Sequence, residues 1–483
     1  MRLLLLIHRY LGIAVGVVMA MWCVSGFVMM YVGFPALDTQ QRLRSLEPIS
    51  WQDCCDFEKL ATQLGVDVAD QFSVEMVVGR PVLQITLTQG RRFLVDLQSG
   101  ERLAAIDATT ALAVARHFAR SLPAKAEPRY LASLERDQWT VQGQLRLDRP
   151  LHHLALDDEA GTELYVSSAT GQIVQHTTTQ QRFWNWLGAV PHWLYPTILR
   201  DNAALWSQVV IWLSLAGVFL TVIGIYIGVA HWLAMKGARW SPYRGISLWH
   251  HLSGLFFGVL TLTWVGSGLV SMNPWGFLEG SGFSAERASV RDAWIDGPQL
   301  ADSLKQLAAT KPPALTRIES APLSGKLFLL LYRGTSIQRV TATTLADAPL
   351  QSSDVERVAQ QLAGDGATQV DLLMDGDNYY YSGHDPVDLP VYRVALDDKD
   401  RTRYYVSPLS GDVLGKVDPI QRWYRWLFEG LHRLDFTSFL RQRPWWDLIV
   451  LPLLSGVTIV CCTGVFMGYR RLTARKRREG AGG

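Results

Sequence analysis

Residues 148–192 read DRPLHHLALDDEAGTELYVSSATGQIVQHTTTQQRFWNWLGAVPH, and residues 388–432 read DLPVYRVALDDKDRTRYYVSPLSGDVLGKVDPIQRWYRWLFEGLH. The two stretches align without a gap at an offset of 240 residues, and 16 of the 45 positions are identical. Both copies end on a histidine, His192 in the first and His432 in the second. Self-similarity at a fixed offset is the signature of a duplicated structural unit, so this repeat predicts a chain built from two equivalent halves.

An apolar block near the N-terminus is repeated in the same way. Residues 8–30 align with residues 250–272 at an offset of 242 residues. The identical positions include His8 and His250, Gly12 and Gly254, Gly16 and Gly258, Trp22 and Trp264, Ser25 and Ser267, Gly26 and Gly268, and Met30 and Met272. The repeated unit is therefore a helix, an outer segment and a second helix.

Four apolar blocks are each long enough to cross a bilayer. They run from Leu3 to Tyr31, from Trp206 to Ala230, from Ile246 to Met272 and from Leu448 to Tyr469. About 20 apolar residues in a helix span a hydrocarbon core roughly 30 Å thick. We therefore expect a membrane protein with a four-transmembrane-helix bundle from a tandem duplication, plus two outer α+β domains.

The basic residues indicate how the chain is oriented. Those near the ends of the apolar blocks are Arg2, Arg9, Lys236, Arg239, Arg244, Arg470, Arg471, Arg475, Lys476, Arg477 and Arg478. Lysine and arginine are retained on the cytoplasmic side, so both termini are expected there and the long segments outside, in the periplasm of a bacterial inner membrane. The basic tail is expected to contact anionic membrane lipid. The net charge of +2 carries no nucleic-acid signal.

These observations predict the following organisation. Transmembrane helices occupy residues 1–34, 205–232, 246–273 and 447–470, the periplasmic domains occupy 35–204 and 274–446, a cytoplasmic loop spans 233–245, and a basic cytoplasmic tail spans 471–483. Each half has an even number of spans, so both halves share one topology. We expect them to be related by a pseudo-twofold axis along the membrane normal.

The outer segments are expected to hold two smaller α/β modules each. In the first segment the residue pattern predicts helices over Trp51 to Leu64 and Asp107 to Ser121. Alternating apolar residues predict strands over 73–78, 82–88, 92–97, 137–143, 151–157 and 163–168. Neither segment shows a nucleophile and base at a recognisable spacing, a phosphate-binding loop or a close metal triad. The recognisable residue patterns in the outer segments are therefore structural, and no catalytic motif is evident there.

The five cysteines do not form a disulfide framework. Cys23, Cys461 and Cys462 lie within apolar blocks, where a small packing role is expected. Cys54 and Cys55 are adjacent in the first outer segment and are open to oxidation in that compartment. Their role stays open.

The placement of the histidines is the main functional signal. His8 and His250 lie at the cytoplasmic end of the first and third spans, and His192 and His432 lie at the outer end, just before the second and fourth. Two matched pairs at opposite membrane faces are what two bis-histidine b-type haems need, since neutral imidazole nitrogens bind haem iron from both faces. The glycine pairs four residues apart, Gly12 with Gly16 and Gly254 with Gly258, would let a flat macrocycle approach the backbone.

Alternatives to haem ligation are open at each histidine. Histidine near a membrane interface often contacts headgroups, and glycine at spacing four is a routine helix-packing device. His251 is a second candidate ligand beside His250, although its repeat partner is Arg9. His231 has no histidine partner and is expected to contact a haem propionate or headgroups. The remaining histidines, His117, His152, His153, His176 and His384, belong to the outer segments and are expected to be structural or exposed.

The segment Ile7-His8-Arg9-Tyr10-Leu11-Gly12, which leads into a span with Ser25-Gly26, resembles the PepSY-associated transmembrane (PepSY-TM) family. Its counterpart Trp249-His250-His251-Leu252-Ser253-Gly254 resembles that family too, as do the PepSY-like turns that end in Gly100, Gly171 and Gly411. The resemblance covers nearly the whole chain. The family includes iron-regulated inner-membrane proteins and is similar to the FoxB-type ferric-siderophore reductases, which carry two haems in a four-helix core.

The resemblance implies a transmembrane dihaem oxidoreductase. Electrons would pass from a cytoplasmic-side reductase or quinol to a periplasmic acceptor such as a ferric siderophore or other ferric chelate. One competing hypothesis is a non-catalytic PepSY membrane protein that binds or regulates an envelope protease or another partner. Another is a metal transporter, which the absence of carboxylates and broken-helix signals in the spans disfavours.

Overall fold

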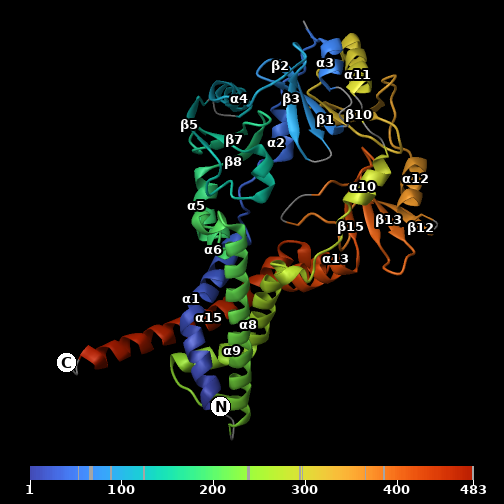
Figure 1. Cartoon of the computed structure of the whole chain (residues 1–483). Helices are drawn as coiled ribbons and strands as arrows, with labels where there is room; N and C mark the ends of the chain where they lie inside the picture. Colours follow the sequence, from blue (N-terminus) through green and yellow to red (C-terminus); the bar gives the residue numbers. More distant parts are fainter. Residues whose placement is uncertain are drawn as a thin grey trace.

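The computed structural model covers residues 1–483 and describes all of them except 53, 65–68, 88–89, 123–125, 236–239, 293–294, 296, 365, 384–386 and 481–483. Long helices form one end of the molecule and sheet-containing α+β regions form the other (Figure 1). Lys236, Arg239 and His384 lie outside the described residues.

Four helices form the bundle: α1 (Arg2–Met29), α8 (Ala203–Leu233), α9 (Ile246–Ser271) and α15 (Trp445–Gly480). In the part of the chain that the structure describes, these are the helices long and apolar enough to cross a membrane, in agreement with the four apolar blocks. Their length and composition are compatible with a membrane protein.

The helices of the two halves are interleaved around the bundle. Helix α1 packs against α8 and α15, and α9 packs against the same two helices. Figure 1 shows α15 crossing the other three at an angle. The core between them contains Val15, Met19, Leu220, Val457 and Cys461, and the Cys23 and Cys461 sulfurs lie 3.7 Å apart there. Cys23 and Cys461 therefore pack in the bundle, whereas Cys462 is exposed.

Two four-stranded antiparallel sheets repeat each other, one from each half. The first contains β5 (Pro128–Leu134), β6 (Leu151–Leu156), β7 (Glu163–Ser167) and β8 (Ile173–Thr177), and the second contains β12 (Thr368–Leu373), β13 (Val391–Leu396), β14 (Arg403–Val406) and β15 (Val413–Val417). Their registers match at the 240-residue offset: Pro128 pairs with Leu156 as Thr368 pairs with Leu396. Both sheets also have an irregularity after the equivalent Tyr165 and Tyr405. The duplication is thus visible in the backbone.

The remaining strands of both halves join in one seven-stranded sheet. Its order is β11-β10-β9-β1-β2-β3-β4, with β1 (Ala69–Val77), β2 (Arg80–Leu87), β3 (Arg92–Asp96) and β4 (Glu101–Arg102) from the first half and β9 (Arg317–Ser320), β10 (Phe328–Arg333) and β11 (Ser336–Thr341) from the second. Apart from the short strand β4, the order is symmetric about the β1–β9 junction, where Val74 pairs with Ile318. In Figure 1 this sheet lies at the top of the molecule, at the end opposite the bundle. The two halves therefore meet in the sheet as well as in the bundle.

Short helices cover and connect the sheets. They are α2 (Thr39–Arg44), α3 (Phe57–Leu64), α4 (Ala108–Arg120), α5 (Thr179–Leu187), α6 (Ala189–His192), α7 (Thr197–Arg200), α10 (Ser284–Arg291), α11 (Gly297–Thr310), α12 (Ser352–Ala363), α13 (Pro419–Tyr424) and α14 (Leu431–Arg433). Single turns lie at Gly143–Asp148, Pro274–Gly276 and Phe439–Arg441, and a π-helical segment, η3, at Arg425–Gly430. Helix α6, which α7 separates from α8, ends on His192, and α14, which the turn Phe439–Arg441 separates from α15, contains His432.

A buried carboxylate holds the β1–β9 junction. Glu75 on β1 is 6% exposed, accepts two hydrogen bonds from Arg42 Nη2 at 2.8 and 2.9 Å, and pairs with Arg317 on β9. Burial acts to raise the pKa of Glu75, but the two guanidinium groups outweigh burial and lower it below its ordinary value. The junction between the halves is therefore an ion-paired one.

Two predictions for the first outer segment are wrong in detail. Residues 137–143 form turns instead of a strand, because the Asp137 side chain accepts from the Trp139 N–H and the Thr140 hydroxyl, which fixes a local turn. The helix predicted from Trp51 begins only at Phe57, since Asp56 caps it by accepting from the Lys59 N–H. Just before it, Cys54 and Cys55 form a disulfide.

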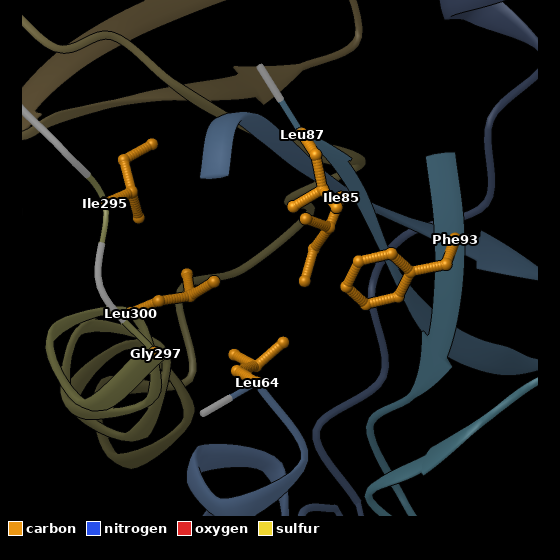
Figure 2. Close-up of a pocket in the computed structure, with 7 residues that line it drawn as sticks. All are labelled: Leu64, Ile85, Leu87, Phe93, Ile295, Gly297 and Leu300. Carbon is orange, nitrogen blue, oxygen red and sulfur yellow. The ribbon is translucent and has the colours of Figure 1, made fainter. Parts of the chain in front are cut away.

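A small apolar cavity lies under the seven-stranded sheet, between β2, β3 and α11 (Figure 2). Figure 2 shows Leu64, Leu87, Phe93 and Leu300 directed toward a common space. Ile85, Ile295 and Gly297 complete the lining. Among the described residues, no polar side chain lines the cavity.

Candidate functional site

The structure brings His8 and His250 together at the end of the bundle where the chain begins. Their ring centres lie 6.3 Å apart, with the ring planes at 44°. Each ring is oriented by the second helix of its own half: His8 Nδ1 lies 3.2 Å from the Leu220 carbonyl oxygen on α8, and His250 Nδ1 lies 3.1 Å from that of Val460 on α15. Leu220 and Val460 are 240 residues apart, so the repeat extends to these contacts. We call this the inner pair.

His192 and His432 also face each other, at the end of the bundle that adjoins the sheets. Their ring centres lie 6.2 Å apart, with the planes at 72°. His192 Nδ1 lies 3.1 Å from the Trp22 carbonyl oxygen and 3.1 Å from Ser25 Oγ, both on α1. His432 Nδ1 lies 3.0 Å from Ser267 Oγ on α9. We call this the outer pair.

The partners of the four rings fix which nitrogen is free. A backbone carbonyl only accepts, so His8, His192 and His250 each carry the ring proton on Nδ1 and present the Nε2 lone pair. Ser267 Oγ donates its own proton to the Trp264 carbonyl, so it accepts from His432 Nδ1 in the same way. Metal-binding histidines in proteins show this arrangement, with one nitrogen on the metal and the other N–H on a carbonyl or other acceptor.

The outer pair is neutral at physiological pH. Burial lowers the pKa of His192 to about 4. Burial, and then the neighbouring His192 and Arg433, lowers the pKa of His432 to about 3. Only the neutral ring has a free lone pair, so both rings are in the metal-binding form without first losing a proton.

The spacing within each pair fits a metal held between two rings. An imidazole nitrogen binds a transition metal at roughly 2.0–2.1 Å, and the ring centre lies roughly 1.1 Å behind it, so opposed ligands have ring centres roughly 6.2–6.4 Å apart. The measured separations of 6.3 and 6.2 Å agree with this. Among the described residues there is no cluster of three or more histidine, cysteine or carboxylate side chains suited to a bare metal ion. Two nitrogens per metal, with the rest of the coordination supplied by a macrocycle, is the ligand set of haem.

The glycines beside the rings are mostly not the ones that the sequence singled out. An added Cβ at Gly224 on α8 would lie 2.7 Å from His8 Cε1, and one at Gly464 on α15 would lie 3.2 Å from His250 Cε1. Of the predicted glycines, Gly258 faces Ile225 of α8 at 2.9 Å, Gly16 faces Val465 at 3.5 Å, and Gly254 has nothing within 4 Å. Gly258 therefore serves helix packing. Gly224 and Gly464 are 240 residues apart, which is the signal that would have found them.

The two secondary candidates lie beside the inner pair but contact other groups. His251 Nε2 lies 3.0 Å from the Gly228 carbonyl oxygen on α8, and the His251 ring stands edge-on to Tyr243. His231 Nδ1 lies 2.8 Å from the Tyr243 hydroxyl. His250, not His251, is thus the ring that faces His8.

The outer-segment histidines have structural partners. His117 pairs with Glu47 at 2.8 Å, His153 pairs with Glu163 at 2.9 Å, and His152 Nε2 lies 2.7 Å from the Ile106 carbonyl oxygen. His176 packs against Phe118. None of these four is opposed to another histidine in the described structure, so none repeats the geometry of the two pairs.

No protein-family model matches the sequence, and no curated protein matches it either. The resemblance to the PepSY-associated transmembrane family therefore stays an expectation. The site has to be interpreted from its own geometry.

Proposed function

We propose that this chain is a transmembrane dihaem oxidoreductase of the PepSY-associated type. It would reside in a bacterial inner membrane with both termini cytoplasmic, and would pass electrons from a cytoplasmic-side donor to a periplasmic ferric chelate. The observation that carries the proposal is the pair of opposed histidines at each end of the bundle, with ring centres 6.3 and 6.2 Å apart. In both pairs Nδ1 of each ring lies at a hydrogen-bond acceptor, which leaves Nε2 free to bind a metal.

The residues present fit two b-type haems. His8 and His250 would hold one, and His192 and His432 would hold the other. The nitrogen and carbonyl contacts described above fix the ring orientation before any cofactor binds, and Gly224 and Gly464 leave room beside the inner rings. Trp264 Nε1 in the bundle core is buried and has no hydrogen-bond partner among the residues that the structure describes.

Haem supplies one-electron redox chemistry when it is bound. The chain contributes the environment in which that chemistry works. The apolar core between the pairs, with Met19, Val457 and Trp264, excludes water, and the buried outer rings stay neutral and attached. No acid–base residue is required, which agrees with the absence of a recognisable catalytic motif in the outer segments.

The ferric chelate is favoured as acceptor by chemistry and resemblance. A chelator built for the harder ferric ion holds ferrous iron weakly, so one-electron reduction at the outer face would release the iron. The ferric-siderophore reductases that the span motifs resemble do this work.

The test is the visible spectrum of the detergent-purified protein, oxidised and dithionite-reduced, with a pyridine haemochrome assay. We expect sharp reduced α and Soret bands and about two haems b per chain. Reoxidation by a ferric siderophore, followed with a coloured ferrous chelator, would then test the acceptor. A folded but colourless protein that takes up no added haem would overturn the proposal and favour a PepSY protein that binds an envelope partner.

A further inference from the structure

Three side chains form a cluster beside the inner pair, where α8 and α9 are joined. His251 on α9 is 7% exposed, and its ring centre lies 5.3 Å from that of Tyr243. Tyr243 lies in the loop before α9, and its hydroxyl is 2.8 Å from His231 Nδ1 near the end of α8. The three groups form a chain from the buried ring of His251 to the half-buried ring of His231.

One nitrogen of this cluster has no partner. His251 Nε2 donates to the Gly228 carbonyl, so in the neutral ring Nδ1 is an acceptor. His251 Nδ1 is buried and has no hydrogen-bond partner among the described residues. A buried acceptor left without a donor is costly, and such groups in native proteins call for an explanation. A ligand that brings a hydroxyl group would satisfy it.

The cluster exists in one half only. The repeat places Arg9 at the position of His251 and Arg471 at that of His231. The two histidine pairs need matched residues from both halves, and this cluster does not. The cluster is therefore a feature of one half of the bundle, at the end that holds the inner pair.

The surroundings favour a flat, apolar ligand that arrives through the lipid. Three exposed aromatic side chains, Trp232, Trp240 and Phe256, lie on or beside the same two helices, and Trp240 stacks on Phe256 with ring centres 6.3 Å apart. Exposed aromatic rings at the end of a membrane-spanning helix belong to the interface between headgroups and hydrocarbon. A water-soluble electron donor would not approach the protein through this aromatic, lipid-facing surface.

We infer that His251, Tyr243 and His231 form a binding site for a membrane hydroquinone that donates electrons to the inner pair. The inference rests on the proposed function and names its donor. His251 Nδ1 accepts a hydrogen bond from the hydroxyl of the hydroquinone and positions the ring beside His250, its neighbour in the chain. Tyr243 and His231 provide a hydrogen-bonded route for protons toward the end of α8.

The overall reaction balances without a further reactant. One hydroquinone loses two protons and two electrons and becomes the quinone, and two ferric chelates each gain one electron and become ferrous. The O–H bonds of the hydroquinone break, and both protons leave on the side of His231.

The test uses the full-length purified protein and decylubiquinone, with binding measured by isothermal titration calorimetry. Tyr243→Phe removes only the hydroxyl, and His251→Phe removes the unpaired nitrogen but keeps a ring. We expect His251→Phe to bind decylubiquinone about tenfold more weakly than the wild type, as the loss of one hydrogen bond predicts, and Tyr243→Phe, which breaks the contact with His231, to act on the rate of electron donation. Arg9→Gln, at the repeat-equivalent position, should bind decylubiquinone as the wild type does.

A second readout separates this inference from the proposed function. In the haem-loaded protein, Tyr243→Phe and His251→Phe should keep both haems and full reduction by dithionite, but lose most of the rate of reduction by decylubiquinol. A dihaem protein that fails to bind decylubiquinone, or whose His251→Phe variant binds it unchanged, overturns the site and leaves the proposed function standing. A protein without haem overturns the proposed function, while the calorimetry still decides the site. If His251→Phe does not fold, the rate of reduction of Tyr243→Phe decides.

Discussion

The inner and outer histidine pairs have the same ring spacing but are built in opposite ways. The inner rings project from the spanning helices α1 and α9, and the carbonyls that orient them belong to α8 and α15. The outer rings precede α8 and α15, and the groups that orient them belong to α1 and α9. Helices α1 and α9 each carry an inner ring and orient an outer ring. Helices α8 and α15 each follow an outer ring in the chain and orient an inner ring. The geometry of both pairs therefore depends on how the four helices pack.

The pairs also differ in how symmetric they are. The outer pair has matched serines, Ser25 and Ser267, on its two rings. At the inner pair, Thr463 Oγ1 lies 3.0 Å from His250 Nδ1, whereas the equivalent position in the first half is Ile223, which has no hydroxyl. The inner pair departs further from the twofold pattern, and it is beside this pair that the one-sided cluster of His251 lies. The outer pair thus keeps the symmetry of the repeat more closely than the inner pair does.

The largest expected effect is the loss of one whole cofactor. His8→Ala should remove the inner haem and His432→Ala the outer one, each lowering the haem content from about two per chain to about one, because one remaining ring cannot complete a bis-histidine site. Pyridine haemochrome assays measure the stoichiometry. His117→Ala, which removes an outer-segment histidine paired with Glu47, is the control and should keep both haems. Full haem content in both ligand variants would contradict the assignment.

A graded series of glycine substitutions should come next in size. An added methyl group meets His8 Cε1 at 2.7 Å in Gly224→Ala, meets His250 Cε1 at 3.2 Å in Gly464→Ala, and meets nothing within 4 Å in Gly254→Ala. Overpacking of this kind costs about 1–3 kcal/mol, so Gly224→Ala should weaken inner-haem binding about tenfold or more, Gly464→Ala less, and Gly254→Ala not at all. Haem titration of the apoprotein measures all three. Equal affinities across the series would show that the inner rings are not confined by α8 and α15.

Substitution of the serine that contacts a ring of the outer pair should weaken binding of the outer haem. Ser267→Ala removes the hydroxyl acceptor at His432 Nδ1 and leaves only the Trp264 carbonyl among the described partners, and substitutions of such partners typically weaken metal binding about tenfold or more. The outer haem should therefore bind more weakly while the inner haem is unchanged. Ser271→Ala, one turn further along α9, is the matched control, since within the described structure its hydroxyl bonds only the Gly268 carbonyl. An effect of equal size in both variants would point to general loosening of α9.

The histidine pairs themselves could be predicted from the sequence because the repeat and the membrane leave few arrangements. Ionisable rings are costly inside a span, and matched rings at equal offsets must meet near the symmetry axis. His8 with His250 and His192 with His432 follow from those two constraints. The orienting carbonyls of Leu220 and Val460 could not be predicted in the same way, because every residue of a helix carries a carbonyl and only the helix rotation selects one.

The joining of the halves through β1 and β9 was not predicted either. Alternation of apolar residues tells which face of a strand is buried, but it does not identify the neighbouring strand. Val74 and Ile318 are far apart in the chain, and nothing local marks them as partners. Glu75 indicated that a partner exists, since a carboxylate in an apolar strand has to be paired. That the partner is Arg317 is visible only in the folded structure.

The smallest effect should come from acid at that junction, and it should reach the outer pair before the inner one. The pKa of Glu75 lies below its ordinary value of 4.5 in the folded protein, so its ion pairs stabilise the fold fully above about pH 4.5 and are lost as the pH falls through the lowered value. The melting temperature should therefore drop by a few degrees between pH 6 and pH 3.5, about the shift that ~1 kcal/mol produces in a large domain. Glu75→Gln should abolish that part of the pH dependence and melt lower at pH 7, whereas Glu101→Gln, which alters an exposed pair with Lys59, should leave the melting curve unchanged. The junction lies at the end of the molecule formed by the sheets, which adjoins the outer pair. On acidification of the wild type, the absorption band of the outer haem should therefore be lost at a higher pH than the band of the inner haem. Loss of both bands at the same pH, in the wild type as in Glu75→Gln, would show that the junction does not hold the outer pair together.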